Sequence, residues 1–533
     1  MVLSVGFLKK YKIDKTKYMH ALKLETAGIQ RYIFSSNKLK VNLGASYIIE
    51  HLLFKELLVQ VLKDKCTEQA AKDTAEWFDA KSVENVPKGN ASFKVGYIGG
   101  GNAVLYFGKK ETLQAVESEF KRQVLQYFPG LEVYSGCFDN ADPNATEQNF
   151  KGFGKDLNEA VTKNRSSSPF LNKTLNHGFY NSCAISGGVA AKYWKIEKQW
   201  VSDEVYSKVQ YTEAVNAAND KHKLDLLDEG SSYSFPMNFE NLSKDKEKAY
   251  IAVVHIDGNN LGSAFIDSGQ LHDTQELSMK VREIGTESLR QTITDGILEK
   301  ELYMENKALP IRPIITGGDD ITFVCEGSLG VPLAKLFLEK FHQLGKEKEL
   351  LDGNVHACAG VAIVKQKYPF YKAYHLSEEL IGEAKRASRG KDNNGSYLSF
   401  MIAGYGTGSS LSDLKAKYAQ PELFAQTYRV LGDKTDLEKG VFEFSALDDH
   451  LKLFKKEEDG QKSIPRNKLM EVRQALVTNQ IEQVWPVVNS RLKVKKDDWN
   501  PLGNKILSFE AIELMDFYND AFIDDKKNEA NDE

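Results

Sequence analysis

The segment IITGGDDITFV, residues 314–324, places two glycines and two adjacent aspartates inside an otherwise apolar run. The flanking runs IRPII and ITFV are rich in β-branched residues, which predicts two strands joined by a hairpin at the glycines. Asp319 and Asp320 would repel each other there, and a partly buried charge is costly unless a partner neutralises it. The hairpin therefore predicts a cation close by.

The sequence on both sides of this hairpin alternates between strand and helix patterns. We expect a buried strand at 249–256, a helix at 275–298, a helix at 331–344, a strand at 355–364, a helix at 374–388 and a strand at 397–402. The order β-α-β-β-α-β, with the acidic hairpin between the second and third strands, is typical of a ferredoxin-like unit.

A weaker copy of the same plan precedes it. We expect a strand at 20–25, a helix at 43–58, a hairpin around GGGN (99–102), a helix at 113–126 and a closing strand in LEVYSGCF. In this alignment Glu25 falls where Asp257 lies, and Gly101 and Asn102 fall where Asp319 and Asp320 lie. The fold class predicted is α+β, with two ferredoxin-like domains of which the first has lost its carboxylates.

The remaining sequence suggests four regions. Residues 1–149 form the first, degenerate domain, 150–245 an irregular or helical insert, 246–403 the second domain, and 411–533 a helical C-terminal domain with a frayed acidic tail. The Gly-rich stretch 404–410 reads as a linker.

Composition excludes several functional classes. The 533 residues carry a formal charge of −5, so nucleic-acid contact would need a local basic patch. No run is long and apolar enough to span a membrane, and we expect a cytoplasmic protein with no membrane partner. No cysteine pair has zinc-ribbon spacing among the five cysteines, Cys66, Cys137, Cys183, Cys325 and Cys358.

The catalytic hypothesis rests on three acids. Asp257 ends the strand 249–256, which in a ferredoxin-like sheet lies beside the acidic hairpin, so it can face Asp319 and Asp320. Converging carboxylates suit two Mg²⁺ or Mn²⁺ ions that also bind nucleotide phosphates. The alternative readings are a Gly-Asp surface turn for the hairpin and an N-cap or Asx turn for Asp257.

Small residues beside the acids would admit a nucleotide triphosphate. Gly317 and Gly318 allow a sharp turn and close approach to the backbone, and Gly258 and Asn260 in DGNNLG lie next to the first acid. Lys385, late on the helix 374–388, is the first candidate for a phosphate contact and Arg389 the second, although either could be a solvated surface residue.

Four ordered motifs resemble a known family: ETAGIQRYIFSSNKLKVNLGASYIIEHLL, HIDGNNLG, TGGDDITFV and HACAGVAIVKQKYPFYKAYHLSEELIGEAKRAS. They are similar to the large Palm-domain subunit of type III CRISPR effector complexes. The resemblance implies two Palm domains, of which the second polymerises ATP into cyclic oligoadenylate when target RNA is bound. It places the metal-binding acids at Asp257, Asp319 and Asp320 and the helix lysine at Lys385.

The sequence departs from the family pattern in three places. The first Palm starts close to residue 20, so we expect no HD nuclease domain, and the cysteine zinc site between the Palms is missing. Asn259 replaces a second acid after Asp257. A subunit bound to guide and target RNA with other effector subunits and a stand-alone relative both fit these departures.

The favoured function is thus a metal-dependent nucleotidyltransferase that converts ATP into a cyclic oligonucleotide messenger in antiviral defence, gated by RNA or partner proteins. One alternative is a guanylate or dinucleotide cyclase, or an AMP transferase. The other is a non-catalytic scaffold subunit of an RNA complex.

Overall fold

The computed structural model describes residues 19–523 except 146, 168–177, 212–224, 229, 244–248, 390–394, 404–409, 419, 433–439, 456, 459–460, 463 and 481–504. The predicted linker and the acidic tail lie largely outside the described residues. The chain forms two compact units. The first comprises 1–36, 40–216 and 260–283, and the second 37–39, 217–259 and 284–533. The four predicted region boundaries remain predictions.

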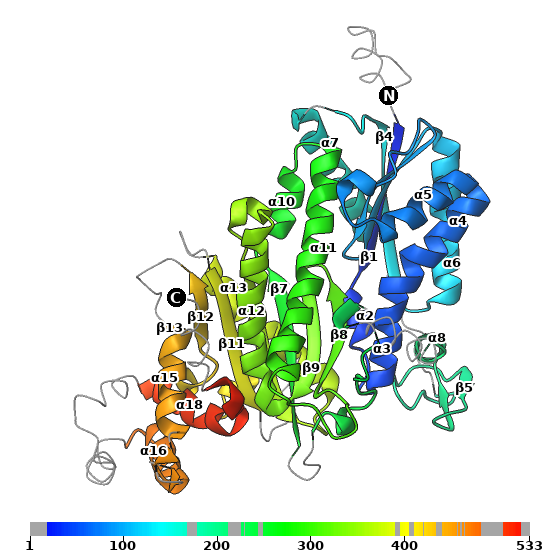
Figure 1. Ribbon diagram of the computed structural model, residues 1–533. Coiled ribbons are helices and arrows are strands. Elements are labelled where there is room, and N and C mark those ends of the chain that lie inside the picture. Colours follow the sequence, from blue (N-terminus) through cyan, green and yellow to red (C-terminus); the bar gives the residue numbers. More distant parts are fainter. Residues whose placement is uncertain are drawn as a thin grey trace. The chain divides into compact units, whose positions relative to one another are not determined.

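The first unit is built on a four-stranded sheet in the order β2-β3-β1-β4. Its strands β1 and β4 are labelled in Figure 1. Its strands are β1 (Met19–Ala27), β2 (Phe93–Gly99), β3 (Asn102–Phe107) and β4 (Glu132–Ala141). Between β1 and β2 the chain forms α2 (Ile29–Ile33), α3 (Leu39–Tyr47), a π-helical stretch (Ile48–Leu58), α4 (Val59–Lys65) and α5 (Glu68–Asp79), and α6 (Lys110–Tyr127) connects β3 to β4.

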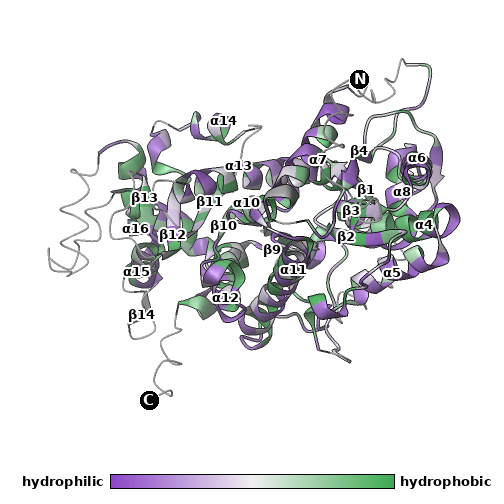
Figure 2. Cartoon of the chain, turned by 90° about the horizontal axis from the view of Figure 1, so that it is seen from above, coloured by the Kyte–Doolittle hydropathy of each residue, from purple (hydrophilic) through white to green (hydrophobic). Residues whose placement is uncertain are grey.

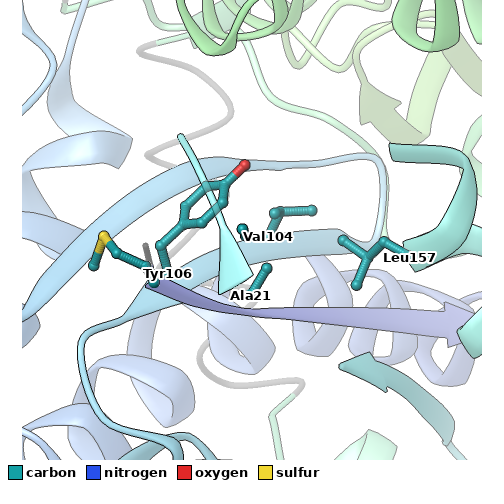
Figure 3. Close-up of a cluster of buried hydrophobic side chains, with 6 residues drawn as sticks. Ala21, Val104, Tyr106 and Leu157 are labelled. Atoms are coloured by element: carbon teal, nitrogen blue, oxygen red, sulfur yellow. The ribbon is translucent and has the colours of Figure 1, made fainter. Parts of the chain in front are cut away.

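Helices cover this sheet because their apolar residues recur at helical spacing. In α6 the buried residues are Leu113, Val116, Phe120 and Val124, and Phe120 stacks on Phe54 of the π-helical stretch at 5.9 Å between ring centroids. Another buried cluster joins β1, β3 and β4 to the long helix α7 (Glu147–Ser167) (Figure 3). It contains Met19, Ala21, Val104, Tyr106, Ala141 and Leu157.

After α7 the first unit continues with β5 (Lys192–Trp194), β6 (Gln199–Val201) and α8 (Asp203–Val209), and later with α10 (Leu261–Asp267) and the start of α11 (Leu271–Ile293). Lys208 of α8 is fully buried, and its ammonium donates to the carbonyl oxygen of Tyr32 at 2.7 Å and to Glu204 at 2.8 Å. The contact with Tyr32 attaches the segment after α7 to the first ferredoxin-like domain.

The second unit contains a seven-stranded sheet in the order β13-β12-β11-β10-β7-β9-β8. The strands are β7 (Tyr250–Gly258), β8 (Ile311–Gly317), β9 (Asp320–Glu326), β10 (Ala357–Lys365), β11 (Gly395–Ala403), β12 (Thr427–Gly432) and β13 (Val441–Glu443). The inner order β10-β7-β9-β8 matches β4-β1-β3-β2 of the first unit, so both units have ferredoxin-like topology. The predicted α+β fold with two such domains is confirmed.

Two helices pack on opposite faces of the second sheet. A Cβ added to Gly330 of α12 (Gly330–Glu347) would meet Ala252, whereas one added to Gly360 of β10 would meet the carbonyl oxygen of Ser377 in α13 (Phe370–Ser388). The helix α12 carries hydrophilic and hydrophobic residues around its axis (Figure 2). Because β-strand side chains alternate between faces, His255 and Asp257 of β7 lie on the α13 face.

The C-terminal region is helical, as predicted, but it also extends the sheet. Its helices are α14 (Leu411–Lys415), α15 (Phe444–Lys455), α16 (Arg466–Val477) and α18 (Lys505–Leu514), accompanied by a short hairpin of β14 (Glu457–Glu458) and β15 (Gln461–Lys462). The strands β12 and β13, expected as part of the helical region, instead pair beside β11. Neither strand has enough residues to show a clear alternation of apolar and polar side chains in the sequence.

Candidate active site

The acidic hairpin is a two-residue turn between β8 and β9. Gly317 pairs with Asp320, which leaves Gly318 and Asp319 as the turn. Gly318 has a φ of +68°, a left-handed conformation that glycine adopts at little cost. A Cβ added to Gly317 would meet nothing within 4 Å, so the backbone is open on that side. The predicted sharp turn and open approach agree with this geometry.

The register of the sheet brings Asp257 to the hairpin. β7 and β9 are antiparallel, and their last pair is Ile256 with Ile321. The next step of the ladder places Asp257 opposite Asp320, and residues directly opposite on antiparallel strands have Cα atoms about 5 Å apart and side chains on one face. The structure therefore brings together the acids that the sequence predicted to converge.

The first unit has the same register without the two acids of the hairpin. Glu25 pairs with Asn102, and Gly99 pairs with Asn102 across a turn of Gly100 and Gly101. Glu25 forms ion pairs with Lys23 and Arg165. The repeated plan is thus present in the backbone, while the carboxylate at this position is bound by basic side chains.

The electrostatics of the second site show an excess of negative charge. Burial, together with the charges of Asp257 and Asp320, raises the pKa of the Asp319 carboxyl to about 7. Lys385 of α13 neutralises part of this charge, since its ammonium lies 2.6 Å from Asp257 Oδ1. The helix α13 packs on β7, which delivers the lysine to the predicted acid.

A divalent cation fits this site by its donor chemistry. Carboxylates are the hard oxygen ligands that Mg²⁺ and Mn²⁺ prefer, and three of them meet here. When no cation is bound, the raised pKa of Asp319 favours the protonated form of its carboxyl. In the described residues, no group of three or more His, Cys, Asp or Glu side chains is already arranged to hold a metal ion. Asp257 is engaged by Lys385 instead, so its carboxylate would have to exchange that partner.

The other predicted nucleotide contacts have different settings. Gly258 is buried at the end of β7, where it pairs with Ala357 of β10. Asn260 adopts a left-handed conformation before α10 and belongs to the first unit. Arg389 follows α13 with an exposed side chain. The assignment of these three residues to nucleotide binding remains a prediction.

A buried histidine in the site, His255, was not singled out by the sequence analysis. His255 Nε2 lies 3.3 Å from Asp320 Oδ1, and its ring stacks on Tyr374 of α13 with centroids 5.5 Å apart. Burial lowers the pKa of the imidazole, but Asp320, Asp257 and Glu378 outweigh this, so the pKa lies above its usual value. The signal was its spacing of two residues before Asp257, which places both on one face of a strand.

Gly285 was missed as well. It lies within α11, and a Cβ at this position would be 1.8 Å from the carbonyl oxygen of Gly318. The helix therefore packs directly against the turn that carries Asp319. A glycine inside an amphipathic helix is the sequence signal for such close packing.

Asn259, at the position where the resemblance implies a second acid, has a structural role here. Its backbone N–H donates to the His356 carbonyl oxygen at 2.8 Å, and its side chain donates to the Gly395 carbonyl oxygen at 3.1 Å. These bonds fix the end of β7 beside β10 and β11.

Comparison with known proteins supports the Palm assignment. Residues 250–394 match the family described as Cas10/Cmr2, second palm domain. No curated protein sequence gives a significant match.

Solved structures share the fold over nearly the whole chain. A Csm1–Csm4 cassette in complex with one ATP superposes with a TM-score of 0.56 at 12% identity, covering 97% of this chain and 73% of that one. The Csm1–Csm4 subcomplex of the type III-A CRISPR-Csm interference complex gives 0.56 at 11% identity, covering 97% and 72%. Csm1 from T. onnurineus gives 0.54 at 13% identity, covering 94% and 70%. Residues 250–394 thus resemble a second palm domain of the Cas10/Cmr2 type, and the resemblance of the chain to the large Palm-domain subunit of type III CRISPR effector complexes is confirmed.

Proposed function

We propose that this chain is a metal-dependent nucleotidyltransferase that joins ATP into a cyclic oligonucleotide messenger in CRISPR-type defence. The observation that carries the proposal is the meeting of Asp257 with the Gly-Gly-Asp-Asp hairpin at adjacent strand ends, with Lys385 on the neighbouring helix. Similar structures hold ATP, AMPPNP and the cyclic products cA3 and cA4, which supports an adenine nucleotide as substrate.

The side chains have separate tasks in this proposal. Asp257, Asp319 and Asp320 would hold two Mg²⁺ or Mn²⁺ ions, which when bound supply charge neutralisation at the α-phosphate and activate a 3′-hydroxyl. Lys385 would contact the triphosphate once its ion pair with Asp257 is exchanged. The open side of Gly317 leaves space for the nucleotide beside the turn.

Two side chains behind Asp320 help to fix its carboxylate. His255 lies against Asp320 from within the sheet, and Tyr374 covers the imidazole. Buried neighbours that fix a ligating carboxylate are a common requirement of metal sites. Asp257 and Asp320 are therefore presented on a rigid sheet rather than on loops, which favours precise positioning.

The cellular setting is part of the same proposal. Csm1 is found with Csm4 in the similar structures, and we infer that this chain works with other effector subunits and with guide and target RNA in the cytoplasm. Among the described residues, no helix is both long and apolar enough to cross a lipid bilayer.

The test is product analysis. Purified protein is incubated with each nucleoside triphosphate and Mg²⁺ or Mn²⁺, with and without RNA, and products are resolved by mass. We expect pyrophosphate release from ATP and a cyclic oligoadenylate, both lost in Asp319→Asn/Asp320→Asn. A guanylate product would favour the cyclase alternative, and tight RNA binding without any product would favour the scaffold.

A further inference from the structure

The hairpin of β5 and β6 in the first unit has one buried side and one outward side; its strand β5 is labelled in Figure 1. Trp194 and Val201 point inward, where they join a buried cluster with Val41, Cys183, Val205 and Val209. In the register of the hairpin, Tyr193 lies opposite Trp200. Because strand side chains alternate between the two faces, Tyr193 and Trp200 lie on the outward side. The buried cluster thus fixes the inner side of the hairpin, and the two aromatic rings on its outer side face solvent.

Exposed apolar side chains are concentrated in this small segment. Tyr193 is 45% exposed and Trp200 51%, with ring centroids 5.6 Å apart and an interplanar angle of 64°. Of the nine exposed large hydrophobic side chains in the described part of the chain, five lie within residues 179–200, namely Phe179, Tyr180, Tyr193, Ile196 and Trp200. Exposed apolar residues scattered singly are ordinary, but five in one short segment, two of them in ring contact, indicate an interaction surface.

The hairpin segment itself is basic, although the whole chain carries a formal charge of −5. Lys192, Lys195 and Lys198 are all exposed in the hairpin. The sole acid between residues 178 and 201 is Glu197, and its carboxylate lies 3.9 Å from the ammonium of Lys40. By the register of the hairpin Lys192 lies on the side of Val201, whereas Lys195 and Lys198 lie in the turn that joins the two strands.

We propose that this hairpin binds single-stranded nucleic acid. Two anchored aromatic rings form a platform on which unpaired bases stack, and lysines beside it neutralise the phosphates that follow. A duplex keeps its bases stacked inside and would leave the rings unused. An apolar protein partner would gain little from the exposed lysines of the turn. The proposal goes beyond the nucleotidyltransferase activity and does not depend on it.

The test uses the full chain and labelled, unstructured 15-nucleotide oligoadenylate and oligouridylate, as RNA and as DNA, in fluorescence anisotropy. We expect Tyr193→Ala/Trp200→Ala to weaken binding about 10- to 100-fold, in line with the loss of stacking on one or two bases. Lys195→Gln/Lys198→Gln should make the affinity less dependent on salt. The RNA and DNA arms show which strand chemistry is preferred.

Tyr127→Ala is the matched control, because Tyr127 is 46% exposed in the same unit but lies on α6. It should bind like the unmodified chain, and circular dichroism melting should show that the hairpin variants remain folded. The proposal is overturned if the unmodified chain binds none of the four oligonucleotides, or if the double aromatic variant binds them equally well. A hairpin variant that keeps its RNA affinity but loses a protein subunit of the complex would also overturn it.

Discussion

Replacing Gly285 by alanine should damage the site through the backbone alone. The added Cβ would lie 1.8 Å from the carbonyl oxygen of Gly318, whereas ordinary van der Waals contact begins near 3.4 Å, so the turn or the helix must retreat by about 1.6 Å. Overpacking of this kind costs about 1–3 kcal/mol of stability. A shift of roughly 1 Å in a reacting group costs on the order of 10²-fold in rate, and the turn carries Asp319.

Helix propensity alone gives the opposite sign, since Gly→Ala within a helix is worth up to about 1 kcal/mol of stabilisation. Gly382 of α13 provides the control, because a Cβ there would meet nothing within 4 Å. We expect Gly382→Ala to be neutral or stabilising and Gly285→Ala to lower both the free energy of unfolding in urea and pyrophosphate release from ATP. If the two variants behave alike in both assays, the packing of α11 on the turn does not position the acid.

Three further predictions concern charges. Lys385→Met should raise the KM for ATP and lower kcat/KM by about 10- to 100-fold, because one charge-assisted contact with a phosphate is lost. Lys385→Arg should recover part of the lost kcat/KM. An unchanged KM in Lys385→Met would refute the phosphate role. Burial raises the pKa of the Glu510 carboxyl to about 7 from its ordinary 4.5. Between these two values the folded state binds a proton that the unfolded state has released. The free energy of unfolding therefore falls by about 2–3 kcal/mol as the pH rises from 5 to 8. Urea unfolding of Glu510→Gln should remove that part of the pH dependence, and parallel pH profiles would contradict it. Lys208→Met should destabilise the first unit by on the order of 3 kcal/mol. The reason is that the carbonyl of Tyr32 and the carboxylate of Glu204 lose their buried donor. An unchanged melting temperature would show that stability does not depend on this ammonium.

The sequence predicted those parts of the fold whose local pattern and packing agree. The apolar β7, the glycine hairpin and the helices α12 and α13 each show their periodicity directly, and the position of Asp257 at a strand end followed from ferredoxin-like topology. The repeat in the first unit was recognisable because its GGGN turn keeps the glycines although the acids are gone.

The remaining features depend on tertiary contacts. Helix α7 lies largely in the insert predicted as irregular or helical, and its bounds were not predicted because charged residues and two glycines obscure its apolar face. Strands β12 and β13 are stabilised by pairing beside β11, which a local pattern does not encode. The role of His255 requires knowing that Asp320 lies on the neighbouring strand, and that of Gly285 requires knowing which backbone faces the helix.

The most direct test of the central claim is a count of bound Mn²⁺ by electron paramagnetic resonance, with a non-hydrolysable ATP analogue present. The account predicts two ions per chain, and a loss of binding in both Asp257→Asn and Asp320→Asn, because the two carboxylates come from adjacent strands to one metal site. Asp267→Asn, on α10, should bind like the unmodified chain. Unchanged Mn²⁺ binding in Asp257→Asn would contradict the claim that this residue and the hairpin share a site.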